Sequence, residues 1–112
     1  MKITATQIRQ IVPRAAFAFR GYNITNLGRS PELLDHRVYG ATVKEVLDEA
    51  SQVCRNVTGK PVDLATRVCR REETTLGSYD EALSLVVAMS LAQLHLLERF
   101  FGVHYADSPL TF

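Results

Sequence analysis

The three histidines are the side chains of this sequence best suited to acid–base or metal chemistry. His36 follows Asp35, and neighbours in sequence rarely point their side chains at each other. His95 falls inside a long apolar segment, which predicts a hydrogen-bonded core histidine, and His104 follows a helix-ending glycine and is expected to be exposed. None of them has a histidine partner four residues away, the spacing typical of a helical metal site. The histidines therefore predict neither a catalytic nor a metal centre.

The other groups that could do chemistry are two acidic pairs and two cysteines. Glu72–Glu73 and Asp80–Glu81 suit helix ends better than acid–base catalysis. Cys54 and Cys69 fall in apolar helical patterns and are expected to be two buried free thiols. The sequence contains no Gly-x-Ser-x-Gly, Walker A or Gly-x-Gly-x-x-Gly motif. On residues alone, the chain has no nucleophile paired with a base.

Composition limits the partners and the location that we expect. The 112 residues carry a net charge of +1, with 46% hydrophobic and 22% charged residues, which indicates one globular segment, 1–112. This balance argues against nucleic acid or an anionic membrane as the main partner. The densest basic cluster, Arg67 to Arg71, is followed at once by Glu72–Glu73 and is interpreted as a solvated helix end. No apolar secretion signal begins the sequence, so we expect a cytoplasmic protein.

Two short apolar runs predict strands. Ala15 to Phe19 is apolar at every position, which favours a strand covered on both faces, and Gly21 ends it. Leu110 to Phe112 follows a turn and begins what is interpreted as a second strand. A strand, a long crossover of helices and another strand are typical of parallel α/β proteins. We therefore predict the α/β class, as a mostly helical chain with one or two short parallel strands.

One amphipathic surface helix is expected from Thr42 to Gly59. Thr42–Glu45 has the form of a capping box, and Gly59 with Pro61 suits the end of the helix. Shorter helices are expected at 6–12, 30–34 and 62–71. The apolar stripe of the long helix repeats at three- and four-residue steps and comprises Val43, Val46, Leu47, Ala50, Val53, Cys54 and Val57.

A second long helix is expected from Ser78–Glu81, another capping box, to Gly102. It carries no Asp, Glu, Lys or Arg from Ala82 to Leu97, and apolar residues occur on all sides. A membrane span needs about 20 apolar residues, and this segment is interrupted by Ser84, Ser90, Gln93 and His95. It therefore predicts a fully buried central helix. The chain supplies only one long partner helix, so we expect its core to be incomplete.

Three segments, taken in order, carry a family resemblance. They are AFAFRGYN, LGRSPELLDHRVYGATVKEVLDEASQVC and ALSLVVAMSLAQLHLLERFFGVHYADSPLTF. Together they resemble the N-terminal part of malonyl-coenzyme A:acyl carrier protein transacylases and of the acyltransferase domains of fatty-acid and polyketide synthases. The strongest points are Phe19-x-Gly21, the helix from Thr42, and the long helix followed by Ser108 to Phe112. The resemblance covers nearly the whole chain and ends just before the position of the family's Gly-x-Ser-x-Gly nucleophile elbow.

The resemblance implies an oxyanion-hole turn after the first strand. Its backbone N–H donor corresponds to Tyr22, beside Gly21, in this sequence. Arg20, Tyr22 and Asn23 stand where the family has proline, glutamine and a second glycine. A backbone donor does not require a particular side chain, so Tyr22 can keep this role.

The resemblance also implies a fold, an activity and partners. The fold is the N-terminal part of an α/β-hydrolase-like acyltransferase domain, here incomplete. The activity moves an acyl group from malonyl-coenzyme A or acyl-coenzyme A to acyl carrier protein through a serine acyl-enzyme, with no metal and no bound cofactor. The family's serine, histidine and arginine lie beyond this segment, so no catalytic residue is assigned in this chain and we expect it to be inactive alone.

Two other interpretations stay open. The chain is alternatively a self-contained helical interaction module that forms an obligate oligomer, with another copy covering its apolar helix. A third possibility is a regulator that binds carrier protein and derives from the acyltransferase family without its catalytic half.

Overall fold

The protein is described from a computed structural model that covers residues 4–14, 16–17, 19, 21, 26–107 and 110–111. Its α-helices are α1 (Ala5–Ile11), α2 (Ser30–Leu34), α3 (Gly40–Thr58), α4 (Leu64–Cys69) and α5 (Tyr79–Phe101). Single 3-10 turns span Val12–Arg14, Leu76–Ser78 and Tyr105–Asp107, and two strands complete the described elements, β1 (Ala16–Phe17) and β2 (Leu110–Thr111).

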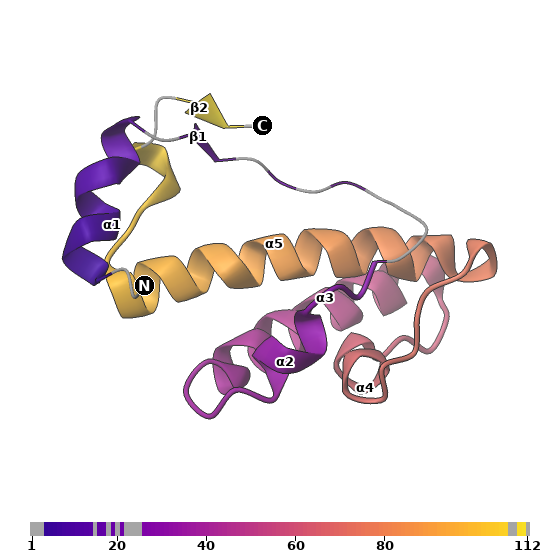
Figure 1. Ribbon diagram of the computed structural model, residues 1–112. Coiled ribbons are helices and arrows are strands. Elements are labelled where there is room, and N and C mark those ends of the chain that lie inside the picture. Colours follow the sequence, from indigo (N-terminus) through magenta and orange to yellow (C-terminus); the bar gives the residue numbers. More distant parts are fainter. Residues whose placement is uncertain are drawn as a thin grey trace.

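The protein is helical, and the predicted α/β class is wrong. The strands β1 and β2 have two residues each, and they pair with each other in parallel at one end of α5 (Figure 1). So short a pair cannot form a sheet layer on which helices pack. Among the described residues the core is built from helix against helix, so the expectation of an α/β-hydrolase-like domain is also corrected.

The core forms where α3 and α5 run antiparallel. At one end the Arg99 guanidinium donates to the Thr42 hydroxyl at 3.2 Å, and at the other Lys60 lies 3.4 Å from the Asp80 carboxylate. Between these contacts, Leu47 and Leu85 are completely buried. Burying a leucine side chain stabilises a fold by about 1.5–3 kcal/mol. The apolar core residues of this pair are Val43, Val46, Leu47, Cys54, Leu85, Ala88, Met89, Ala92 and Leu96.

Helices α2 and α4 pack against α3 and complete the core. Leu64 and Val68 of α4 are fully buried there. The buried Ser51 hydroxyl donates to the Leu47 carbonyl and accepts from the Leu64 N–H at 2.9 Å. Because this hydroxyl is buried and satisfied on both sides, it fixes the start of α4 on the middle of α3.

The start of α3 differs from the sequence prediction. The helix begins at Gly40, so the proposed capping box at Thr42 is wrong, and Thr42 is buried against Arg99 instead. The His36 ring nitrogen Nδ1 accepts from the N–H groups of Val38 and Tyr39 at 3.1 and 3.2 Å. This local turn precedes a helix whose N-cap is Tyr39, three residues before the N-cap that the capping box predicted.

The other ends of the two long helices are determined by residues close to them in the sequence. Gly59 and Gly102 have left-handed φ values of 70° and 66° and end α3 and α5 as predicted. The Ser78 side chain does not cap α5; it closes a reciprocal capping box with Thr75 around the preceding 3-10 turn. Helix α5 therefore begins next to Ser78 as expected, but by a different hydrogen-bond pattern.

Helix α1 lies at the C-terminal end of α5, close to the β1–β2 pair (Figure 1). The Arg9 guanidinium donates to the Phe101 carbonyl at 2.9 Å. This bond satisfies one of the carbonyl groups that a helix leaves free at its end. It joins α1 to the C-terminal end of α5. The segments that precede and follow the helical core in sequence therefore lie close together.

Candidate functional site

The β1–β2 pair joins the two segments that the sequence resemblance places beside a catalytic centre. Ala16 pairs with Leu110 and Phe17 with Thr111, in parallel. In a parallel pair both strands run toward the same edge, so the backbone that follows each strand emerges on the same side. The structure thus makes neighbours of two segments that lie near opposite ends of the chain.

The predicted oxyanion turn follows β1. Gly21 is exposed, and a Cβ atom at its position would meet no atom within 4 Å. Its backbone is therefore open to solvent or to a ligand. Tyr22, the predicted N–H donor, lies outside the described residues, and its role stays a prediction.

A hydrogen-bond cluster around the half-buried Glu73 anchors the chain at the buried Asn26. The Glu73 carboxylate accepts from the backbone N–H groups of Asn26 and Leu27 at 2.8 and 3.3 Å. It also accepts from the N–H of Thr74 at 2.8 Å, and the Asn26 amide donates to the buried Thr74 hydroxyl at 2.8 Å. Burial alone would raise the pKa of Glu73, but the hydrogen bonds from these three backbone amides outweigh it and lower the pKa.

Arg67 supports the same cluster from the other side. Its guanidinium donates to the carbonyl groups of Glu72 and Glu73 at 3.2 Å each, and to the Glu81 carboxylate at 3.1 Å. The Arg67 and Glu81 side chains are 17% and 21% exposed, so the solvated helix end predicted for the basic cluster is wrong for Arg67. Through these bonds Arg67 of α4 ties the backbone of Glu72 and Glu73 to Glu81 of α5.

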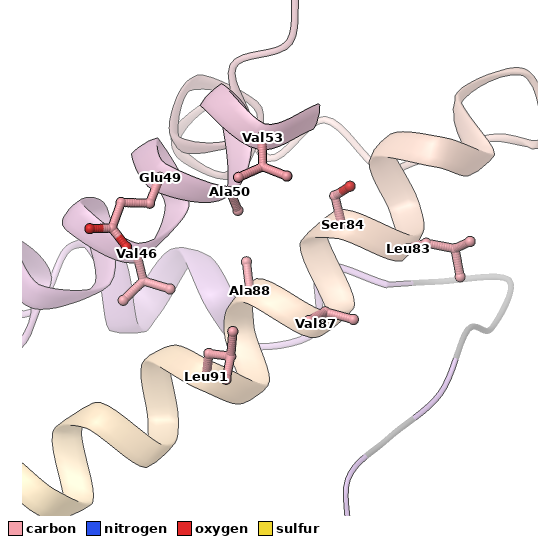
Figure 2. A pocket seen from close by; sticks show the side chains of 9 residues that line it. All are labelled: Val46, Glu49, Ala50, Val53, Leu83, Ser84, Val87, Ala88 and Leu91. Carbon is pink, nitrogen blue, oxygen red and sulfur yellow. The ribbon is translucent and has the colours of Figure 1, made fainter. Parts of the chain in front are cut away.

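An apolar groove runs between the two long helices. We call it the α3–α5 groove, and its volume is about 430 Å³. Figure 2 shows Ala88 and Leu91 pointing from α5 toward α3. The groove is lined by Val46, Glu49, Ala50, Val53, Leu83, Ser84, Val87, Ala88 and Leu91.

This groove contradicts the prediction that α5 is buried on all sides. Leu83, Val87 and Leu91 are exposed, while Leu85, Val86 and Ala92 are buried. The covered face packs on α3, and the uncovered face carries apolar side chains in the same helix. Sequence periodicity could not separate these faces, because both are apolar.

A charged depression continues the groove toward the C-terminal end of α5. His95 is exposed there, so the prediction of a core histidine is wrong. His104 is exposed, as predicted. The described residues contain no cluster of His, Cys, Asp or Glu that could hold a metal ion. The depression is about 490 Å³ in volume and is lined by Thr42, Glu45, Val46, Glu49, His95, Glu98 and Arg99.

The cysteines are both free, but they differ in burial. Cys54 is buried, as predicted, whereas Cys69 is exposed at the end of α4 and the prediction of a buried thiol is wrong there. Cys69 lines a shallow pocket together with His36 and Lys44. The apolar pattern of the short helix α4 could not show that its last turn faces solvent.

Comparison with known proteins gives no relative: no family model, curated protein or solved structure matches this chain. One helical stretch, Leu76–Phe101, is long and apolar enough to cross a membrane by length and composition. Of the 18-residue window that meets this test, 39% is buried inside the molecule, and the core helix of a soluble protein passes the same test.

Proposed function

We propose that this chain is the N-terminal part of an enzyme that transfers a malonyl or other acyl group from coenzyme A to acyl carrier protein. The observation that carries the proposal is the parallel pairing of β1 with β2. In the family that the sequence resembles, an oxyanion-hole turn follows the first of these strands and the nucleophilic serine follows the second. The pairing supports the proposal because it brings the corresponding segments of this chain to one edge.

The reaction has two acyl transfers. A serine oxygen attacks the thioester carbonyl and expels coenzyme A, and the phosphopantetheine thiol of the carrier protein then attacks the serine ester. Each tetrahedral intermediate places negative charge on the carbonyl oxygen, where preorganised backbone N–H groups stabilise it. We propose the N–H of Tyr22, beside the open backbone of Gly21, as one of these donors. The serine and its base would come from polypeptide outside residues 1–112, so the chain alone is inactive.

The test begins with the coding sequence that adjoins residue 112. We expect it to encode Gly-x-Ser-x-Gly within a few codons, and we expect the longer product to transfer malonyl groups to carrier protein. A longer product without this motif, or malonyl transfer by the purified 112-residue chain, would contradict the proposal.

The role of Tyr22 is tested by a matched pair of substitutions in the longer product. Tyr22→Pro removes the backbone donor and is expected to lower kcat by about 100- to 1,000-fold. Tyr22→Phe keeps the N–H and the ring and is expected to leave kcat within about threefold of the parent enzyme. Equal activity of the two variants would show that the Tyr22 N–H does not stabilise the oxyanion.

A further inference from the structure

The His36 side chain holds the turn that leads into α3. Its ring nitrogen Nδ1 accepts from the backbone N–H groups of Val38 and Tyr39 at 3.1 and 3.2 Å. The His36 carbonyl accepts from the N–H of Gly40 at 2.9 Å. A helix leaves its first N–H groups without backbone acceptors, and a side chain placed before it can supply one. His36 therefore does for this turn what Ser, Thr, Asn or Asp does at most helix starts.

Both side-chain bonds require that Nδ1 carries no proton. In a neutral imidazole one ring nitrogen carries the proton and the other accepts, so the two bonds assign the proton of His36 to Nε2. An imidazolium donates from both nitrogens, and its Nδ1 proton would face two backbone donors. A cation is also disfavoured at the N-terminal end of a helix, where the helix dipole is positive. Protonation of His36 therefore breaks the two bonds.

The carboxylates nearest to His36 along the chain already have arginine partners. Glu32 of α2 lies 2.6 Å from Arg29, and Asp35 lies 3.8 Å from Arg71. An imidazolium at His36 would compete with an arginine for either carboxylate. The acidic residues of this corner therefore do not compensate for the lost bonds.

The other groups around the ring include three cations and one aromatic face. Positive charges repel an imidazolium, and the face of a tyrosine attracts one weakly. A single ring contact does not replace two backbone hydrogen bonds. The groups are Arg37, which follows in sequence, Lys44 of α3 and Cys69 of α4 in the same shallow pocket, Tyr39 against the ring, and Arg99 of α5 over the neighbouring Phe100.

The His36 ring is the first of a row of aromatic rings that joins α3 to α5. It stacks on Tyr39 with ring centroids 4.2 Å apart. Tyr39 in turn contacts Phe100 and Phe101 at centroid distances of 5.1 and 6.5 Å. The carbonyl of Phe101 accepts from Arg9 of α1. The turn therefore contacts the end of α5 at which α1 and the β1–β2 pair lie (Figure 1).

We propose that His36 is a pH switch, whose protonation opens the turn before α3 and loosens the contact of Tyr39 with the C-terminal end of α5. His36 is exposed, so protons of the solvent reach its ring. Imidazole is the side chain that changes charge between about pH 5 and pH 8. Because the bonds need the unprotonated ring, the turn is closed toward the upper end of this range and opens as the pH falls. The proposal goes beyond acyl transfer and does not depend on it.

Nuclear magnetic resonance of the 112-residue chain tests the switch between about pH 7.5 and about pH 5.5. At the higher pH we expect the proton of the His36 ring on Nε2. On acidification the amide signals of Val38 and Tyr39 should shift together with those of the ring. The hydrogen-exchange protection factor of the Gly40 amide, which corrects for the intrinsic effect of pH on exchange, should fall at least about threefold, as expected for the loss of a helix cap.

His36→Asn separates the proton from the hydrogen bonds. The side-chain oxygen of Asn is a preferred capping acceptor and takes no proton in this pH range. We expect this variant to keep the protection of Gly40 at about pH 7.5 and to lose its fall on acidification. His104→Asn is the matched control, because His104 is also exposed but lies 3.7 Å from Glu98 of α5. It should leave the fall unchanged.

Four results would overturn the proposal. Two need no variant: a proton on Nδ1 of His36 at about pH 7.5, and amides of Val38, Tyr39 and Gly40 that do not respond while the ring titrates. The other two are a fall in Gly40 protection that persists in His36→Asn, and one that disappears in His104→Asn. The last result would assign the pH response to the other ring.

Discussion

The substitution Glu73→Gln is expected to destabilise the fold substantially although it changes one atom. One carboxylate oxygen of Glu73 accepts from the N–H groups of Asn26 and Leu27, and the other accepts from the N–H of Thr74. An amide side chain has one accepting oxygen, so either orientation places its NH₂ group against a backbone donor. A hydrogen bond to a charged group contributes about 1.5–3 kcal/mol, and we expect a loss of about 2–3 kcal/mol.

Urea unfolding followed by circular dichroism measures this loss. Glu72→Gln is the matched control, because Glu72 is exposed and meets Arg67 through its backbone carbonyl, which the substitution keeps. We expect Glu72→Gln to stay within about 0.5 kcal/mol of the parent chain at pH 7. A Glu73→Gln variant as stable as the parent would refute the role of the carboxylate in anchoring Asn26 and Leu27.

The same site predicts a pH dependence. The pKa of Glu73 in the folded state is lowered from its ordinary value of 4.5, so the stabilisation is complete above pH 4.5 and is lost as the pH falls through the folded-state pKa. The difference in unfolding free energy between the parent chain and Glu73→Gln should therefore narrow as the pH falls below about 4.5. A difference that stays constant from pH 7 to pH 3 would contradict this assignment.

Two further substitutions test the packing. Leu47→Ala removes a fully buried side chain between α3 and α5 and is expected to cost about 2–5 kcal/mol in urea unfolding, whereas Val57→Ala, at an exposed position, should cost under about 1 kcal/mol. Gly40→Ala forces a Cβ atom against the Leu34 carbonyl oxygen and should lower the melting temperature by about 10 °C or more. Gly77→Ala, whose Cβ atom would have its nearest neighbour at 3.6 Å, should leave the melting temperature nearly unchanged. Equal effects within either pair would refute the packing argument.

The ends of the long helices were predictable where one residue decides them. Gly59 and Gly102 adopt the left-handed conformation that glycine tolerates best, and this needs no information beyond the local sequence. The start of α3 was not predictable in this way. The Thr42 hydroxyl binds Arg99 across the helix pair, and no local pattern contains a partner so distant in the sequence.

The fold class and the candidate site could be predicted only in part from the sequence, for the same reason. The apolar runs predicted strands where β1 and β2 lie, but each of these strands has two residues, and the core forms between helices instead. The uniform apolar character of α5 indicated a core helix, yet Leu85 is buried and Val87 is exposed. Which apolar face of α5 becomes buried is decided by tertiary packing and not by the local sequence. The Glu73 cluster was missed because its partners, Asn26 and Leu27, lie on a distant segment.

The bond between Arg9 and Phe101 has a consequence for the order of folding. These residues are 92 positions apart, and the β1–β2 pair is of comparable separation. Closing a loop of this length costs chain entropy before any contact is gained, whereas α3 and α5 are joined by a much shorter connection. We infer that the α3–α5 hairpin forms early in the folding transition state, and that α1 and the strands dock afterwards. The edge proposed for catalysis would then be the last part of the chain to assemble and the first to open.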